Sequence, residues 1–481
     1  MSDAATGVTE VATDAATRRR PVIAVVGAGI AGLAAAHELA LDGRVDVIVV
    51  EGSSRTGGKL LRGEVAGVQT DLGAESLLAR RPEALRLLDE LGLTSEVVHP
   101  QTVQARIWSR GALRPLPAGH VMGVPSDLRA LSASGVVSRR ALVRAAFDRA
   151  LPATRVAGDM TVGAYVGSRL GHAVVDRLVE PLLGGVYAGR ADELSLRATL
   201  PQVAAVAGSR SLLRALKPAR TAAASSGPVF AGLPGGVGRL AETLTASVVS
   251  RGVDVRLDST VRGLERTAAG WRLLVGSAAA PETLDADAVV IAIPAAPASR
   301  LLASAVPAAA SELAAIDYAS MAIVTMAFVP SAFEIPLTSS GFLVPSIEHR
   351  LVKAATFSSV KWAWYPGDLV MLRCSIGRYR DVAELQRADD ELIAATVRDL
   401  AAIVGVRANP VDASITRWGG GLPQYTVGHL DRVERIKRHV QAVPRLAVCG
   451  AAYDGVGIPA CIGGGRAAAT QLLRDVFAER Q

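Results

Sequence analysis

The chain has few cysteines, and they are isolated from one another. Its 481 residues include only Cys374, Cys449 and Cys461, and none of them forms a CxxC pair. An odd and widely spaced set argues against a disulfide framework and against a structural zinc site built on cysteine. The pattern fits a protein of a reducing compartment.

Long apolar runs are also missing, although the mean hydropathy is +0.31. A membrane-spanning helix needs roughly 20 consecutive apolar residues. The longest candidate, residues 286–316, is interrupted by Pro294, Pro297, Arg300 and Pro307. A spanning helix is therefore not expected, and membrane contact is expected to be peripheral at most.

The first 20 residues lack the apolar core of a signal peptide and are rich in Thr and Ala. We expect residues 1–20 to form a disordered tail on a cytoplasmic protein.

Lysine is scarce, since only five of the 52 basic residues are Lys. The net charge of +7 favours acidic partners, either a polycarboxylate or a membrane surface. A general compositional bias toward Arg would give the same net charge without any such partner. Aromatic residues make up only 4% of the chain, and no basic cluster is interleaved with them, so nucleic acid is not an expected partner. The seven His show neither a metal-type His/Glu spacing nor a Ser-His-Asp order, so no metal site is predicted.

What the sequence does contain is a complete β-α-β pattern near its start. Residues 21–26 (PVIAVV) predict a buried strand, and a helix follows that ends near Gly43. Residues 45–50 (VDVIVV) predict a second strand, which Glu51 closes 19 residues after Gly32. Between the first strand and the helix lies the turn Gly27-Ala28-Gly29-Ile30-Ala31-Gly32, so the pattern is a dinucleotide-binding fingerprint.

Each glycine of this turn has a physical role. Gly27 permits the tight turn, Gly29 lets the backbone approach a pyrophosphate, and Gly32 lets helix and strand pack closely. The N-terminus of the helix offers free N–H donors to the phosphates. Glu51 can accept hydrogen bonds from both ribose hydroxyls, which disfavours a 2′-phosphate.

Two segments that follow resemble the flavin amine-oxidase superfamily. Arg55-Thr56-Gly57-Gly58-Lys59 is similar to the superfamily's GG-[RK] turn, and Asp71-Leu72-Gly73-Ala74-Glu75-Ser76 is similar to its segment under the flavin. The resemblance implies that the dinucleotide is FAD.

The remaining pattern predicts an α/β protein with a discontinuous Rossmann-like FAD domain, a mixed-sheet substrate domain and a helical subdomain. We assign 21–80, 228–297 and 411–481 to the FAD domain. The substrate domain takes 81–95 and 298–410, and the helical subdomain takes 96–227. In the last FAD segment we expect a strand at 445–449, then a glycine turn, then a helix over 465–477.

Four further blocks resemble the protoporphyrinogen/coproporphyrinogen oxidases, flavoenzymes of haem synthesis, and occur in the family's order over nearly the whole chain. They are EPLLGGVYAG with LSLRAT (180–199), IDYAS (316–320), RW with PQYTVGH (417–429) and GVGIP with CI and GR (455–466). Two positions depart from the family pattern, Ala74 in place of Pro and Gly464 in place of Ser, and both concern the flavin contacts.

The resemblance implies a set of site residues and a reaction. The FAD contacts that it implies are Gly27, Ala28, Gly29, Ile30, Ala31, Gly32, Glu51, Lys59, Gly73, Ala74, Glu75, Ser76, Val261, Trp418, Val456, Gly457 and Ile458. It suggests Arg81 and Arg106 for the substrate carboxylates, which Arg can bind in a bidentate manner. The flavin would take hydride from a porphyrinogen bridge and pass electrons to dioxygen, which gives hydrogen peroxide, and no catalytic side chain is assigned.

Several functional alternatives remain open. The basic charge favours coproporphyrinogen III, with four propionates, over protoporphyrinogen IX, with two. Other hypotheses are a flavin amine oxidase or desaturase, which the few aromatics disfavour, and a flavin-bound porphyrin carrier without activity. Cys461 could tether a flavin covalently, and His429 is expected to be structural. The resemblance also leaves room for transient contact with a ferrochelatase.

Overall fold

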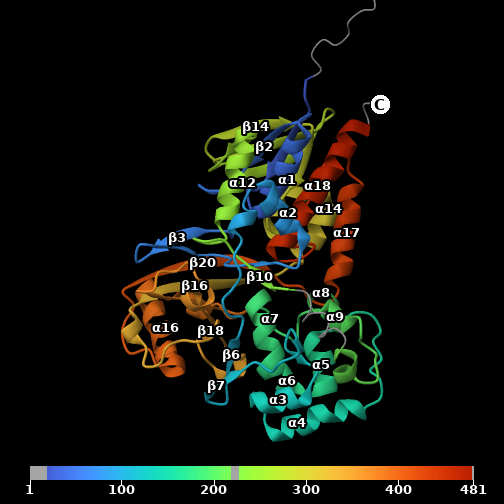
Figure 1. The fold of residues 1–481 in the computed structure, drawn as a ribbon. Helices are drawn as coiled ribbons and strands as arrows, with labels where there is room; N and C mark the ends of the chain where they lie inside the picture. Colours follow the sequence, from blue (N-terminus) through green and yellow to red (C-terminus); the bar gives the residue numbers. More distant parts are fainter. Residues whose placement is uncertain (1–18, 218–226, 479–481) are drawn as a thin grey trace, which may run out of the picture.

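The computed structural model describes residues 19–217 and 227–478 and has three parts (Figure 1). A five-stranded sheet with its helices forms one end of the molecule, and a seven-stranded sheet and a group of short helices lie side by side at the other (Figure 1). All but the last two residues of the predicted N-terminal tail lie outside the described residues. The predicted α/β fold class is confirmed.

The five-stranded sheet is parallel throughout and has the order β11-β2-β1-β15-β21. Its strands are β1 (Val22–Val26), β2 (Asp46–Val50), β11 (Asp254–Arg256), β15 (Ala288–Ile291) and β21 (Leu446–Val448). The two central strands are near-continuous Val and Ile because helices cover both faces.

Two hydrophobic cores flank this sheet. One contains side chains of α1 (Ile30–Asp42), α2 (Pro82–Glu90), α12 (Arg239–Ser250) and α18 (Ile458–Ala478). The other contains side chains of α13 (Ala295–Leu302), α14 (Pro307–Ala314) and α17 (His429–Gln441) and of a small antiparallel sheet. That sheet consists of β12 (Val261–Arg266), β13 (Trp271–Gly276) and β14 (Pro281–Ala286).

The C-terminal helix α18 begins earlier than the sequence predicts. Gly463 and Gly464, which the sequence places before the helix expected over 465–477, lie inside the helix. A Cβ added at Gly465 would lie 2.1 Å from the carbonyl oxygen of Ala31, so this glycine allows α18 to approach α1 closely. Packing against α1 outweighs the low helix propensity of glycine here.

The seven-stranded sheet has the order β20-β16-β19-β18-β17-β6-β7 and is antiparallel except where β17 meets β6. Its strands are β6 (Ala105–Ser109), β7 (Ala112–Pro115), β16 (Tyr318–Phe328), β17 (Gly341–Leu343), β18 (Val352–Phe357), β19 (Val370–Ile376) and β20 (Asp412–Pro423). Helix α16 (Asp389–Val404) packs on one face through Leu392, Leu400 and Ile403.

The group of short helices has its own core around Tyr165 and Leu178. Its helices are α3 (Leu128–Ser134), α4 (Arg139–Ala146), η2 (Phe147–Arg149), α5 (Val162–Leu170), α6 (His172–Val174), the π-helical turn η3 (Val175–Val179), α7 (Glu180–Tyr187), α8 (Leu196–Thr199), α9 (Pro201–Ala204) and α10 (Leu212–Ala215).

Short elements complete the three parts or connect them. They are β3 (Arg62–Val65), β4 (Val68–Asp71), β5 (Leu77–Leu78), η1 (Thr94–Glu96), β8 (His120–Val121), β9 (Val124–Pro125), β10 (Phe230–Ala231), η4 (Pro330–Ala332), η5 (Ser346–Glu348), α15 (Ser358–Lys361) and η6 (Ala383–Gln386). Of the described helices, none combines the length and apolar character needed to span a bilayer.

Four segments differ from the predicted division into domains. Residues 105–115 and 412–423 belong to the seven-stranded sheet by strand pairing. The α2 segment and residues 298–316 pack in the cores of the five-stranded sheet instead of the substrate domain. The domain to which each segment belongs is decided by strand pairing and helix packing between distant segments. Local composition does not reveal those contacts. The other boundaries stay predictions.

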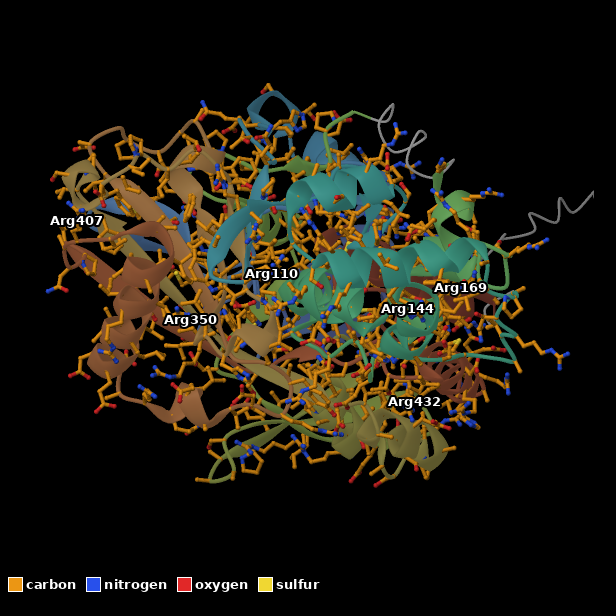
Figure 2. All side chains as sticks on the ribbon, turned by 90° about the horizontal axis from the view of Figure 1, so that it is seen from below. Arg110, Arg144, Arg169, Arg350, Arg407 and Arg432 are labelled. Atoms are coloured by element: carbon orange, nitrogen blue, oxygen red, sulfur yellow. The ribbon has the colours of Figure 1, made fainter. Side chains whose placement is uncertain are left out.

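The helical part depends on one buried ion pair between Arg169 of α5 and Asp148 of η2. Arg169 lies among the helices of this part, whereas Arg350 and Arg407 lie on the part that carries α16 (Figure 2). The Arg169 guanidinium donates to a carboxylate oxygen of Asp148 at 2.7 Å, and both side chains are at most 1% exposed. The same carboxylate accepts from Ser211 Oγ at 2.7 Å and from the backbone N–H of Leu213 at 3.0 Å. Asp148 therefore joins α5 to the start of α10.

We predict that Arg169→Met lowers the free energy of unfolding by about 3–5 kcal/mol, because it leaves the buried Asp148 carboxylate without its cation. Arg438→Met is the control, since Arg438 forms an exposed pair with Glu434 within α17 and such pairs contribute little. Urea denaturation of both variants measures the difference. Equal stability of the two variants would contradict this role.

Candidate functional site

A cavity of about 660 Å³ lies at the carboxyl edge of the five-stranded sheet and extends over the seven-stranded sheet. Its size is in the range of ligand pockets, and the carboxyl edge of a parallel sheet is the usual place for one. Residues that directly follow β1, β2 and β15 line it at one end, and residues of β16, β18 and β19 line it at the other.

The glycine turn after β1 has the geometry that the sequence predicts. Gly27 has φ +102°, and a Cβ at this residue would lie 2.8 Å from the carbonyl oxygen of Ala292. A Cβ at Gly32 would lie 1.9 Å from the carbonyl oxygen of Gly27. Side chains are therefore excluded at both positions, and their predicted roles in the turn and in close packing are confirmed.

The N-terminus of α1 faces the cavity through Gly29, Ile30 and Ala31. Gly29 is the N-cap and has no side-chain cap, and a Cβ built on it would meet nothing within 4 Å. The first-turn N–H groups of a helix have no partner within the helix and carry its positive dipole end. This arrangement fits the pyrophosphate of a dinucleotide.

Glu51, at the end of β2, lines the cavity beside this turn. One carboxylate oxygen accepts from the backbone N–H of Ala28 at 2.7 Å, and the other accepts from the N–H and Oγ of Ser53. Each carboxylate oxygen has two lone-pair sites, so acceptor capacity remains on the oxygen that Ala28 contacts. Glu51 therefore fixes the glycine turn and can also accept from a ribose hydroxyl.

The next wall of the cavity consists of the segments 58–60 and 73–76, which are hydrogen-bonded to one another. The N–H of Ala74 donates to the carbonyl of Lys59 at 3.0 Å, and a Cβ at Gly73 would lie 2.0 Å from that carbonyl oxygen. The N–H of Gly57 donates to the carbonyl of Ala28 at 2.8 Å, which attaches this wall to the glycine turn. Backbone contacts hold both segments at the place where the flavin ring is expected.

Glu75 is the most highly bonded side chain of this wall. It accepts from Trp362 Nε1 at 2.6 Å and from Arg373 Nη1 at 2.8 Å, and Lys361 Nζ lies 3.5 Å from it. Burial alone would raise the pKa of Glu75, but the charges of Lys361 and Arg373 and these hydrogen bonds hold the pKa below its ordinary value. Arg373 also donates to the carbonyl of Gly73. The carboxylate therefore ties residues 73–76 to the seven-stranded sheet.

Trp418 and the start of α18 complete the flavin end of the cavity. Trp418 Nε1 donates to the carbonyl of Leu72 at 3.4 Å. Burial lowers the pKa of Lys59 and raises the pKa of the Cys461 thiol to about 11. Cys461 is therefore a neutral thiol at physiological pH.

The structure brings most of the predicted flavin residues to one cavity, but not all of them. Those on the wall are Gly27, Gly29, Ile30, Ala31, Glu51, Lys59, Gly73, Ala74, Glu75, Ser76, Trp418, Val456, Gly457 and Ile458. Ala28 and Gly32 lie behind the wall as parts of the turn. Val261 starts β12 and packs against the neighbouring core, away from the cavity.

The two arginines suggested for the substrate do not line the cavity. Arg81 is the N-cap of α2, is 51% exposed and lies 3.4 Å from Glu83. Arg106 is exposed on β6. Their role in substrate binding stays a prediction, and this geometry does not support it.

Sequence reasoning missed Arg373, Lys361 and Trp362, which hold Glu75 in place. A signal for Arg373 exists, because VMLRCSI (370–376) is a buried strand pattern interrupted by one cation. A charged residue in such a strand needs a buried partner. His429, by contrast, is buried, stacks on Tyr425 with ring centroids 3.9 Å apart and lies off the cavity wall, as expected of a structural residue.

Comparison with known proteins gives consistent results. The chain is 38% identical to the coproporphyrinogen III oxidase of Mycobacterium leprae, over 94% of this chain and 98% of that protein. It is 30% identical to the protoporphyrinogen oxidase of Bos taurus, over 94% and 98%. A solved structure from Exiguobacterium sp. 255-15, provisionally assigned as a protoporphyrinogen oxidase, superposes with a TM-score of 0.84 at 32% identity, over 94% of this chain and 99% of that one.

The model of the family described as flavin containing amine oxidoreductase matches residues 30–473, which is nearly the whole described chain. The predicted oxidoreductase class and the FAD cofactor are thereby confirmed, and the glycine turn, Glu51 and the helix N-terminus fit that cofactor. The chain belongs to the flavin-containing amine oxidoreductases.

Proposed function

We propose that the protein oxidises coproporphyrinogen III to coproporphyrin III, with dioxygen as the electron acceptor and hydrogen peroxide as the second product. Three two-electron steps complete the reaction, each of which consumes one dioxygen and releases one hydrogen peroxide. The similarity to proteins named coproporphyrinogen III oxidase, over almost their full length, supports this substrate.

The observation that carries the proposal is the apolar half of the cavity. Beyond the flavin end, the wall includes small and apolar side chains from the seven-stranded sheet and α7, namely Val186, Met321, Ile323, Ala354 and Leu422, beside the polar Thr356 and Ser375. An apolar slot that continues from a flavin site suits a large, flat tetrapyrrole.

The side chains of the cavity suit a reaction that needs no strong base. Bound FAD supplies the hydride acceptor and returns the electrons to dioxygen. The carboxylate of Glu75 is fully engaged, and the Tyr318 hydroxyl accepts from the N–H of Ala295 at 2.9 Å, while burial raises its pKa. Because the pyrrole N–H becomes acidic as hydride leaves the adjacent bridge, the chain mainly orients the substrate and excludes water.

The other parts of the prediction belong to the same proposal. The flavin residues on the cavity wall are the cofactor contacts that we propose, and oxidation in the cytoplasm as a step of haem synthesis is the cellular role. Contact with a ferrochelatase stays a prediction. Protoporphyrinogen IX is the alternative substrate, because the Bos taurus relative is named for it.

We predict that the purified protein forms porphyrin faster from coproporphyrinogen III than from protoporphyrinogen IX. The reason is that a basic protein attracts a tetra-acid more strongly than a di-acid. Porphyrin fluorescence in air, with controls that lack protein, measures both rates. Preference for the di-acid would transfer the proposal to protoporphyrinogen, and no rate above the controls with bound FAD would refute the oxidase function.

We predict that Glu51→Gln raises the dissociation constant for FAD about tenfold or more. The neutral amide weakens the charge-assisted hydrogen bonds that the carboxylate accepts at the glycine turn and from the ribose. Fluorescence titration of the apoprotein with FAD measures the constant. Glu265→Gln, on the exposed side of β12, is the matched control and is expected to bind as the wild type does. Unchanged affinity in Glu51→Gln would exclude Glu51 from the FAD site.

A further inference from the structure

Gly185 lies inside helix α7, although neither its backbone nor the packing around it requires a glycine. A glycine inside a helix lowers the stability of that helix relative to alanine. The φ of Gly185 is not in the left-handed region, so its conformation is open to any residue. A Cβ built on Gly185 would lie 3.7 Å from Cδ2 of Leu343 and meet no other described atom within 4 Å outside its own helix. Alanine would therefore fit, and the glycine needs another explanation.

The open side of Gly185 faces the substrate end of the cavity. Gly185 is exposed and lines the cavity together with Val186. Helix α7 packs against β17 and β18, on the side of the helical part that faces the seven-stranded sheet (Figure 1). Because the atom nearest to the built Cβ belongs to Leu343 of β17, a methyl group at residue 185 would lie between α7 and the sheet. The cavity occupies that space, and Ala354 of β18 lines it there as well.

Other glycines of the cavity wall show what an open side means. A Cβ at Gly29 would meet nothing within 4 Å, and Gly29 lies at the helix N-terminus that fits the pyrophosphate. A Cβ at Gly457, at the flavin end, would meet a single atom, at 3.8 Å. At Gly27, by contrast, the backbone of the protein itself excludes a side chain. Gly185 therefore resembles the glycines whose open side faces the cofactor, but it lies at the substrate end.

We propose that Gly185 sets the clearance of the substrate end, because its missing side chain lets the porphyrinogen ring lie against the backbone of α7. This inference rests on the proposed function and names a specificity-determining residue of its substrate site. A residue that would stabilise α7 here would occupy the place of the ring. Larger side chains at position 185 therefore exclude a tetrapyrrole and leave the flavin end unchanged.

The test is binding of coproporphyrin III, the oxidised and fluorescent product, to the FAD-loaded protein. Gly185→Ala is expected to raise its dissociation constant about tenfold, because one methyl group more or less in a close-fitting pocket changes affinity by about that factor or more. Gly185→Leu is expected to raise the dissociation constant further. The KM for coproporphyrinogen III is expected to rise in the same order.

Gly184→Ala is the matched control. Gly184 precedes Gly185 in α7 and does not line the cavity, and a Cβ built on it would meet only the carbonyl oxygen of Gly189, at 3.9 Å, outside its own helix. Alanine is the better helix former, so both alanine variants are expected to unfold at the same temperature as the wild type or higher. Both are expected to retain FAD, and only Gly185→Ala is expected to bind coproporphyrin III more weakly.

Three results would overturn the proposal. Wild-type affinity in either Gly185 variant would show that the ring does not approach this backbone. An equal loss of affinity in Gly184→Ala would assign the effect to α7 as a whole. Weaker binding together with a lower unfolding temperature and loss of FAD would assign Gly185 to the fold.

The outcome is distinguishable from failure of the proposed function. If the wild type oxidises coproporphyrinogen III and Gly185→Ala binds the product equally well, only the role of Gly185 is wrong. If the FAD-loaded wild type neither oxidises coproporphyrinogen III nor binds coproporphyrin III, the proposed function itself fails, and the role of Gly185 fails with it.

Discussion

The buried carboxylate of Glu75 is the interaction on which the cavity depends. Glu75 comes from the segment that follows β4, whereas Arg373 and the indole of Trp362 come from the seven-stranded sheet and its short helix. One acidic side chain thus joins the wall at the flavin end to the floor at the substrate end. Removing either partner of such a pair leaves a buried charge uncompensated. Residues 73–76 therefore keep their position only while the ion pair between Glu75 and Arg373 is intact.

This constraint also accounts for how charge is distributed in the protein. The chain is basic, but its buried arginines are already paired. Arg169 is paired with Asp148 and Arg373 with Glu75, so a carboxylate of the protein itself neutralises the charge of each. Surface arginines such as Arg407 and Arg432 have acidic partners as well. Net charge therefore indicates long-range attraction of an acidic substrate, whereas recognition of a carboxylate requires a cation that the fold has left without a partner.

The sequence alone predicted the nucleotide end well, because that end is determined locally. The strand, glycine turn, helix and Glu51 all lie within about thirty residues of chain, as is usual for such a unit. Gly27 and Gly32 have a conformation or a close approach that only glycine allows. The substrate end could not be predicted in the same way. Arg373 bonds to Glu75, and Gly463 and Gly464 lie inside α18, only because segments hundreds of residues apart meet. For the same reason β6, β20 and α2 fall outside the domains to which their neighbours in sequence were assigned.

Local sequence determines the flavin end, whereas contacts between distant segments determine the substrate end, and this difference has a functional consequence. Flavin-containing amine oxidoreductases that act on different substrates can share the flavin end, since the glycine turn and the helix N-terminus recognise only the cofactor. In this protein the substrate end of the cavity is formed by the face of the seven-stranded sheet and by α7. That face offers small and apolar side chains beside the polar Thr356 and Ser375, and the Glu75 carboxylate and the Tyr318 hydroxyl of the cavity wall are engaged in hydrogen bonds. Such a surface fits the proposed function, in which a flat, acid-bearing ring lies against the flavin and the acidity of its own pyrrole N–H completes the oxidation.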